Sequence, residues 1–382
     1  MITETWLEPI KPMLAKWVQT KDWKLLLVFE QSLREVAQNK SKQQPLQVKT
    51  SLASQGYAMV DVETRFGGRG RSPVFQALLQ FVCGYHNLDY RDVAHVGHGR
   101  MIILHGSKQQ RKLWIPKLVA GSLVGIAATE AHGGSRIQDT RTVAKNNGRT
   151  HLLNGEKVYI SRIREAETFV VFFKFEKDET LSAALIDLSH GGVKTELWEP
   201  LGLRGWSWGK VVFENAPFTD QDVLGARGQG LAIFKEHFAY YRPMVAITTL
   251  GAAAAVLDQV MVHINQRVSG KGISMPRDSC LEIIGNQYLG INAGILSALC
   301  AIVQNVENSP HASLWSRAVK AWSVEQAYQA VSELALYMGA SAIREDQFVA
   351  KALCDLRVFL MADGIHDSLR RSAGRTLLDL PS

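Results

Sequence analysis

Two short stretches combine hydroxyl, glycine and aromatic residues in a way that suits a ligand carrying phosphate. They read Gly125-Ile-Ala-Ala-Thr-Glu-Ala-His-Gly-Gly-Ser-Arg136 and Leu153-Asn-Gly-Glu-Lys-Val-Tyr-Ile-Ser161. Adjacent glycines let a ligand approach the backbone, and loop N–H groups can donate to an anion together with the Ser135 hydroxyl. A plain hairpin loop also uses Gly-Gly-Ser, so this motif alone leaves both interpretations open.

The order of these two motifs resembles the flavin-binding β domain of the acyl-CoA dehydrogenase family. Further family landmarks occur in the family's order. Before the two motifs come the glycine-rich turn Glu63-Thr-Arg-Phe-Gly-Gly-Arg-Gly70 and a helix with its exit from Leu104 to Gly121. The resemblance covers nearly the whole chain. It implies an FAD-dependent oxidoreductase that desaturates an acyl thioester between its α and β carbons, with the thioester carried by CoA or by an acyl carrier protein.

The resemblance also implies which residues bind the flavin. It puts Thr129 and Ser161 near the flavin ring, Ser135 on the pyrophosphate, and Tyr159 against the ring face, where many relatives have Trp. A flavin ring needs hydrogen bonds along its edge and an aromatic neighbour. Tyr in place of Trp keeps the stacking surface and adds a hydroxyl, so flavin binding stays an expectation.

Two more cofactor contacts are implied by the resemblance, and both depart from the family pattern. Arg267 matches the Arg that binds FAD across a subunit interface, although the Phe-Gly that follows it in relatives is missing. A guanidinium suits a pyrophosphate, while a solvated Arg at a helix end is the alternative. Gly339 is the one glycine left of the family's Gln-x-x-Gly-Gly. These matches imply a homodimer or homotetramer in which the adenine end of FAD is bound differently from the family pattern.

The resemblance places the catalytic base at Asp363, where the family has the Glu of Glu-Gly-Thr. Asp keeps the carboxylate but is one methylene shorter, and a misplacement of roughly an ångström can cost about a hundredfold in rate. Some relatives carry the base on an earlier helix, at the position of Tyr241, which with Arg242 is expected to line the substrate pocket. Alternatively, Asp363 has no catalytic role and is simply a polar residue that ends a helix before a glycine.

Other functions on the same fold stay open. Flavin monooxygenases and nitroalkane oxidases share it, and the nitroalkane oxidases resemble this chain in having Asp at the base position. A flavin-free scaffold that binds an acyl carrier is the third possibility, motivated by Leu336, Ala340 and the altered turn after Arg267. The identity of the electron acceptor is not encoded in any of these motifs.

The elements that must position these residues change character twice along the chain. Residues 1–123 have mostly helical periodicity, residues 124–227 contain short β-rich runs separated by turns, and residues 228–382 contain four long amphipathic segments. The four segments are Leu231 to Arg267, Ser279 to Val306, Ser313 to Met338, and Phe348 to His366. The sequence therefore predicts an α+β protein with an N-terminal helical domain, a central β-barrel or sandwich and a C-terminal four-helix bundle.

The overall charge favours an anionic partner. The net charge is +7 and the sequence pI is about 9.2, which suits a CoA nucleotide or the acidic face of a carrier protein. The basic residues are scattered and do not cluster with aromatic residues, so nucleic acid is not expected as a partner. Because the chain is basic and departs from the degradative family pattern, we expect a small or polar acyl group.

Several other classes of site are not expected. The four cysteines lie far apart, which predicts reduced thiols, and His95 and His98 lack a third ligand at useful spacing, so no metal site is predicted. Uninterrupted apolar runs do not reach the roughly 18 to 20 residues of a membrane helix. We therefore expect no membrane association and a cytoplasmic location.

Overall fold

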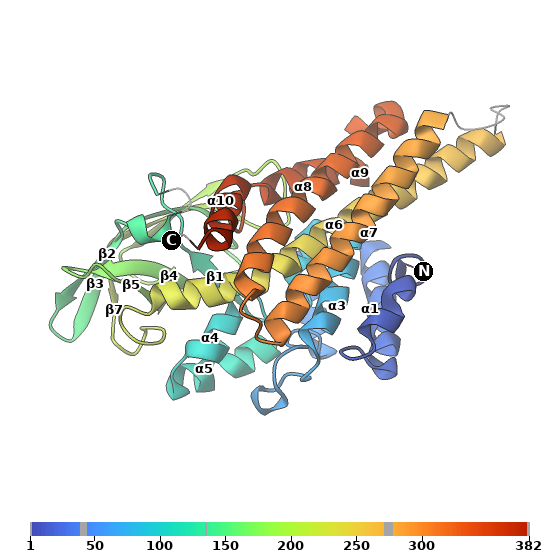
Figure 1. The fold of residues 1–382 in the computed structure, drawn as a ribbon. Coiled ribbons are helices and arrows are strands. Elements are labelled where there is room, and N and C mark those ends of the chain that lie inside the picture. Colours follow the sequence, from blue (N-terminus) through green and yellow to red (C-terminus); the bar gives the residue numbers. More distant parts are fainter. Residues whose placement is uncertain (1, 39–43, 134–135, 271–277, 380–382) are drawn as a thin grey trace.

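The computed structural model describes residues 2–38, 44–133, 136–270 and 278–379. A β-sheet occupies one end of the molecule, and long helices extend away from it (Figure 1). The helices of the first and last thirds of the chain pack against one another, while the middle third forms the sheet. The predicted α+β class and the order helical, β, helical are therefore confirmed.

The N-terminal part is helical. It begins with a π-helical turn, Thr3–Leu7, and a 3-10 helix, Glu8–Leu14, where Pro9 and Pro12 remove two backbone donors. Five α-helices follow: α1 (Thr20–Gln38), α2 (Pro45–Ser54), α3 (Pro73–His86), α4 (Gly99–His105) and α5 (Lys108–Val119). A 3-10 turn, Leu88–Asp92, follows α3 and carries charged residues into the protein interior.

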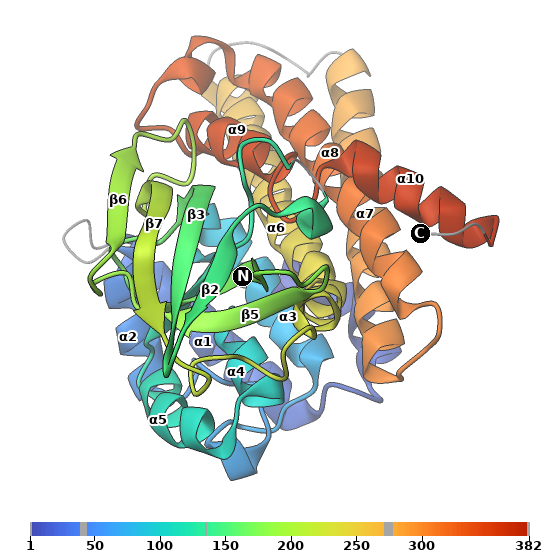
Figure 2. The same cartoon turned by 90° about the vertical axis from the view of Figure 1, so that its left-hand side faces the viewer.

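The central strands form one seven-stranded mixed sheet. Its strands are β1 (Leu123–Ala127), β2 (Val143–Asn147), β3 (Thr150–Ser161), β4 (Ala166–Phe175), β5 (Leu181–Ile186), β6 (Val193–Trp198) and β7 (Trp208–Phe218). The order is β1-β4-β2-β3-β7-β6, and β5 pairs with β4. Strand β1 lies parallel to β4, whereas β3 and β7 are antiparallel. Figure 2 shows the sheet face-on with the long helices behind it.

The C-terminal part contains α6 (Gly230–Gly270), α7 (Asp278–Val306) and α8 (Ala312–Met338), which run side by side (Figures 1 and 2). Their bounds agree with the first three predicted helices. The fourth prediction, one helix from Phe348 to His366, is wrong because the chain forms α9 (Phe348–Phe359) and then α10 (His366–Leu377). Between them Asp363 has φ 58° and Gly364 has φ 114°, values that a right-handed helix cannot contain.

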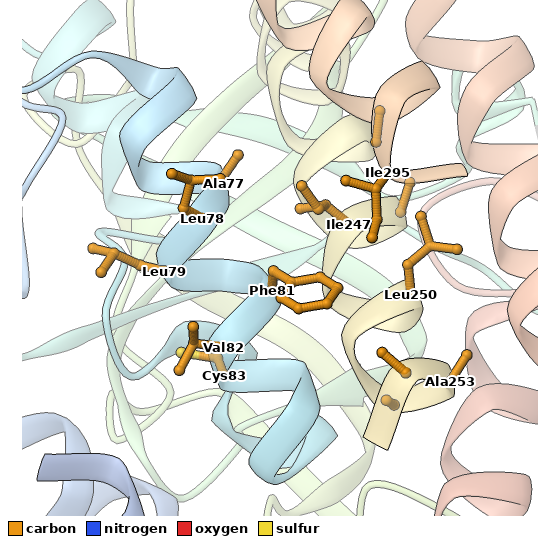
Figure 3. Packing of buried hydrophobic residues seen from close by; sticks show 14 of the residues in the cluster. Ala77, Leu78, Leu79, Phe81, Val82, Cys83, Ile247, Leu250, Ala253 and Ile295 are labelled. Carbon is orange, nitrogen blue, oxygen red and sulfur yellow. The ribbon is translucent and has the colours of Figure 1, made fainter. Parts of the chain in front are cut away.

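The main hydrophobic core contains residues of α3, α6 and α7, and Ile295 of α7 lies beside α6 on the side away from α3 (Figure 3). Phe81 of α3 packs toward Ile247 and Leu250 of α6. The two backbones come so close that a Cβ on Gly84 would lie 1.8 Å from the Thr248 carbonyl oxygen. Glycine is therefore required at that crossing. The buried alanines Ala252 to Ala255 extend the same close contact along α6.

Helices α6 and α7 are long and apolar enough to cross a membrane by length and composition, with mean hydropathies of 1.7 and 1.6 over their most apolar 18-residue windows. The expectation that the chain has no membrane helix was based on uninterrupted apolar runs, and such runs do not detect an 18-residue window whose average is apolar despite a few polar residues. The α6 window is 78% buried, as in the core helix of a globular protein, whereas that of α7 is only 39% buried. Helix α7 therefore leaves part of its apolar surface uncovered by the described residues.

Candidate active site

A buried ion pair fixes the loop that follows β1 onto strand β3. Lys157 Nζ lies 2.8 Å from Glu130 Oε1 and also donates to the Ala128 carbonyl oxygen. Glu130 accepts further hydrogen bonds from the hydroxyls of Thr140 and Thr142. Burial opposes ionisation of Glu130, but Lys157 and these donors lower its pKa to about 2. Burial lowers the pKa of Lys157 to about 8, although Glu130 opposes this, so both partners are charged at neutral pH and the pair holds the two motifs together.

Tyr159 and Thr129 lie next to each other at the edge of this network. The Val158 N–H donates to the Thr129 carbonyl oxygen at 2.9 Å, so the two motifs meet as the sequence predicts. A register shift between Val158 and Ile160 places Tyr159 in a bulge with φ 58°. Its side chain is 66% exposed, and the ring packs edge-on against Trp198 at 5.7 Å. An exposed aromatic in a strained bulge is a common feature of binding sites.

Ser161 ends the same strand and connects to a buried charge cluster. Arg162 Nη1 donates to the Ser161 hydroxyl oxygen at 2.7 Å, and Arg162 Nη2 donates to the carboxylate of Asp92. Arg91 Nε donates to the same carboxylate at 3.3 Å. Asp92 thus joins two guanidinium groups inside the protein, which offset the cost of burying its charge.

Tyr241 belongs to this cluster and does not act as a base in it. Its hydroxyl donates to Asp92 Oδ1. Burial and the neighbouring Asp92 charge raise the pKa of Tyr241 well above its ordinary value. Burial would raise the pKa of Asp92, but Arg162 and Arg91 lower it far below the usual range. Tyr241 therefore stays protonated and holds the Asp92 carboxylate in place.

Asp363 lies on the other side of Arg91, so the cluster runs from Ser161 to the predicted base. Asp363 Oδ2 is 3.8 Å from Arg91 Nη1, beyond hydrogen-bond distance. The Asp363 side chain is 12% exposed. Among the described residues, Oδ2 has no hydrogen-bond partner. A carboxylate oxygen that is buried, charged and not engaged in a hydrogen bond is suited to accept a proton.

Two cations from neighbouring helices hold the bend that presents Asp363. Arg242 Nε of α6 donates to the Asp363 carbonyl oxygen at 2.9 Å. Lys320 Nζ of α8 donates to the carbonyl oxygens of Phe359 and Gly364, both at 2.9 Å. Burial lowers the pKa of Lys320 to about 7, and the Asp363 charge partly opposes this. Arg242 thus lies at the site as predicted, and it binds backbone.

The other predicted site residues lie elsewhere or outside the described residues. Ser135 is one of the residues that the structure does not describe. Arg267 is exposed near the end of α6, and Gly339 ends α8 with φ 59° and open space around its Cα. Among the described residues, neither contacts the cluster around Asp363. A role for them in a site completed by a second subunit stays a prediction.

His95 and His98 do not form a shared ligand set. The Gly97 N–H donates to His95 Nδ1, whereas His98 Nδ1 lies 2.9 Å from Nε2 of His237. In the part of the chain that the structure describes, no group of three or more His, Cys, Asp or Glu residues is placed to bind a metal ion. Burial lowers the pKa of His98 to about 3, so it is neutral.

Sequence reasoning missed the residues that connect the two halves of the site, namely Arg91, Asp92, Arg162 and Lys320. They come from three distant parts of the chain and meet only in the fold. One signal was available. Two arginines, Arg91 and Arg162, lie in or beside apolar segments, where a charged residue needs a buried partner.

Three family models match the chain in succession: the N-terminal domain of acyl-CoA dehydrogenase over residues 28–122, the middle domain over 125–216 and the C-terminal domain over 228–378. Together they span most of the sequence. They match in the same order as the helical, β and helical parts of the structure.

Curated relatives agree with these models. An acyl-CoA dehydrogenase of Bacillus subtilis is 25% identical over 89% of this chain and 91% of its own length. The mitochondrial very long-chain specific acyl-CoA dehydrogenase of Rattus norvegicus is 27% identical over 81% of this chain and 50% of its own. The chain spans half or less of the first curated relatives it matches, since a probable acyl-CoA dehydrogenase of B. subtilis is matched over 36% of its length.

Solved structures share the fold at lower identity. The acyl-CoA dehydrogenase of Geobacillus kaustophilus has a TM-score of 0.87 at 20% identity and covers 94% of this chain and 99% of its own. The prolyl acyl carrier protein oxidase AnaB has a TM-score of 0.80 at 19% identity, covering 92% and 98%. At these identities the likeness concerns the fold.

Proposed function

Because this chain belongs to the acyl-CoA dehydrogenase family, we propose that it desaturates an acyl thioester between the α and β carbons, with Asp363 as the base. The observation that carries the proposal is the Asp363 carboxylate. Its Oδ2 atom is buried and has no hydrogen-bond partner among the described residues, while Arg242 and Lys320 fix the bend around it. That arrangement leaves the oxygen available for an α-proton.

The family binds FAD, and the residues at the end of β3 fit a flavin. Tyr159 offers an open aromatic surface beside Trp198, Thr129 is exposed, and the Ser161 hydroxyl accepts from Arg162, which leaves its own proton free to donate. These three residues would hold the ring, and Arg267 of a second subunit would reach the pyrophosphate. When bound, FAD supplies the acceptor for the hydride that leaves the β-carbon.

The chain's own residues account for the proton half of the reaction. Asp363 takes the α-proton, and the electrons of that C–H bond form the new double bond as hydride leaves the β-carbon. Arg91, 3.8 Å from the carboxylate, keeps a positive charge beside the reacting atoms. The Tyr241 hydroxyl stays protonated and bound to Asp92, so it does not compete for the proton.

The net charge of the protein is the basis for our proposal that the acyl group is carried by an anionic carrier. A net charge of +7 suits either anionic carrier, CoA or an acyl carrier protein. The polar surroundings of Asp363 favour a small or polar acyl group over a long apolar chain, because buried cations and an alkyl chain make poor neighbours. We also propose a cytoplasmic location.

We also propose that the protein is a homodimer or homotetramer. Helix α7 exposes Leu281, Tyr288, Leu289 and Leu296; the spacing of seven residues from Leu281 to Tyr288 and from Leu289 to Leu296 places them on one side of the helix. A second copy of the chain would cover this stripe. The proposal fits the expected role of Arg267 across an interface.

An anaerobic titration tests the proposed function. The purified protein should have a flavin absorbance band near 450 nm, and a short acyl-CoA or acyl carrier thioester should bleach it. If oxygen consumption and peroxide release accompany turnover, the enzyme is an oxidase. A flavin that no thioester bleaches contradicts the proposal, and a protein that binds no FAD would instead be a scaffold.

A further inference from the structure

Arg162 occupies a position that is unfavourable for an arginine. The residue is 2% exposed, and its backbone has φ 65°, in the left-handed region that residues other than glycine rarely adopt. Its Nε atom is buried without a hydrogen-bond partner among the described residues. A buried charge, a strained backbone and an unpaired donor each cost free energy. Because such strain is concentrated at functional sites, it points to a role for Arg162 beyond stability.

Three contacts fix the Arg162 guanidinium against Ser161. Nη1 donates to the Ser161 hydroxyl oxygen at 2.7 Å, and Nη2 donates to the Asp92 carboxylate. The Cζ atom lies 5.1 Å from the centroid of the Trp206 ring. Because the Ser161 oxygen accepts from Arg162, the proton of its hydroxyl points elsewhere. Ser161 is partly exposed, so its hydroxyl is an oriented donor that a ligand can reach.

The charge around the Arg162 guanidinium is positive in sum. Arg91 and Arg162 both donate to the Asp92 carboxylate, and the buried Lys49 donates to the Asp92 backbone carbonyl oxygen at 2.8 Å. Burial lowers the pKa of Lys49 to about 8, so it is charged at neutral pH. With Asp363 on the other side of Arg91, three cations face two carboxylates. These five side chains therefore carry one positive charge in excess.

We propose that Arg162 is a positioning residue that acts on the flavin through Ser161: it leaves the Ser161 proton free for the ring and brings an excess positive charge close to it. A hydride carries two electrons and one proton, so the reduced ring bears one more negative charge than the oxidised ring. Hydrogen bonds and charges near the ring nitrogens set how easily a flavin is reduced. Arg162 therefore raises the reduction potential of bound FAD. This inference rests on the proposed function, because it takes the flavin ring to lie at Ser161.

The midpoint potential of bound FAD, measured anaerobically against a reference dye without any thioester, tests this role apart from turnover. Arg162→Gln should weaken the binding of reduced FAD relative to oxidised FAD roughly tenfold, as expected for one lost charge-assisted contact. For a two-electron couple, a tenfold change lowers the potential by about 30 mV. Arg164→Gln is the matched control, because it removes the same charge from an exposed residue nearby. The control should leave the potential unchanged.

The outcomes separate the role of Arg162 from the reaction. An unchanged potential in Arg162→Gln overturns the inference, while bleaching of the wild-type flavin by a thioester would still support the proposed dehydrogenation. A lower potential in Arg162→Gln, with no thioester bleaching the wild type, supports the inference and contradicts the dehydrogenation. If Arg162→Gln fails to fold, Ser161→Ala decides the question, because it leaves the ion pair of Arg162 and Asp92 intact. Loss of the oriented hydroxyl should also lower the potential, and an unchanged value would overturn the inference.

Discussion

The guanidinium of Arg91 and the carboxylate of Asp363 face each other with 3.8 Å between Nη1 and Oδ2. Neither atom has a hydrogen-bond partner among the residues that the structure describes. Attraction between the charges positions the carboxylate, while its oxygen stays available for a proton. A direct hydrogen bond would compete with that proton. At this distance Arg91 can position the Asp363 carboxylate without occupying the oxygen that accepts the proton.

Replacing Asp363 by Glu tests how well the shorter side chain is matched to its bend. The Asp363 backbone has φ 58° and is held by Arg242, so Glu would move the carboxylate toward Arg91. We expect Asp363→Glu to reduce FAD at roughly a tenth to a hundredth of the wild-type rate, because misplacement by about an ångström is costly. Stopped-flow absorbance at 450 nm measures this rate. A variant faster than the wild type would contradict the account of the bend.

Tyr159 is predicted to contribute to FAD binding and little to stability. Its side chain is 66% exposed, so its removal opens no cavity in the core. We expect Tyr159→Ala to weaken FAD binding roughly tenfold and Tyr159→Trp to retain it, since either ring supplies a stacking surface. Fluorescence titration of the apoprotein with FAD measures the affinity. Unchanged affinity in the alanine variant would remove Tyr159 from the cofactor site.

Lys320 predicts a dependence of stability on pH. Burial lowers its pKa from 10.5 to about 7 in the folded protein, so between these values the unfolded chain binds more protons. Raising the pH through this window therefore favours the folded state. From pH 7 to 9 the wild type should gain about 2 kcal/mol of unfolding free energy relative to Lys320→Met. Urea unfolding of both proteins measures it, and parallel pH profiles would refute the shift.

The exposed stripe on α7 predicts the assembly state. Leu289 is 66% exposed in the single chain, and a charge placed there would be costly to bury at an interface. Leu289→Asp should convert the oligomer to a monomer by light scattering after gel filtration. Leu104→Asp, on α4, is the matched control and should leave the assembly unchanged. A wild-type monomer would contradict the proposed oligomer.

Much of the fold follows from periodicity in the sequence. The first three bundle helices were predicted close to their observed bounds. The break between α9 and α10 was missed. Asp363 and Gly364 adopt positive φ, and helical periodicity continues across them, so the pattern does not reveal the bend.

The candidate site was predictable only in part. The two motifs around Thr129 and Ser161 meet as expected, through the hydrogen bond from the Val158 N–H to the Thr129 carbonyl oxygen. The buried chain through Arg91, Asp92 and Arg162 was not predicted. Arg162 pairs with Asp92 across seventy residues of sequence, and periodicity along a single sequence does not reveal such a contact. Their charge in or beside apolar segments was the only available signal.

The claim that Asp363 removes the α-proton is tested most directly by hydrogen exchange at the α-carbon. The FAD-loaded protein would be incubated in D₂O with an acyl thioester, and deuterium at the α-carbon followed by mass spectrometry. The wild type should catalyse exchange, while Asp363→Ala should lose it by at least about a hundredfold, as expected for a missing general base. Asp367→Ala, an exposed neighbour, should behave as the wild type. Exchange at the wild-type rate in Asp363→Ala would contradict the account.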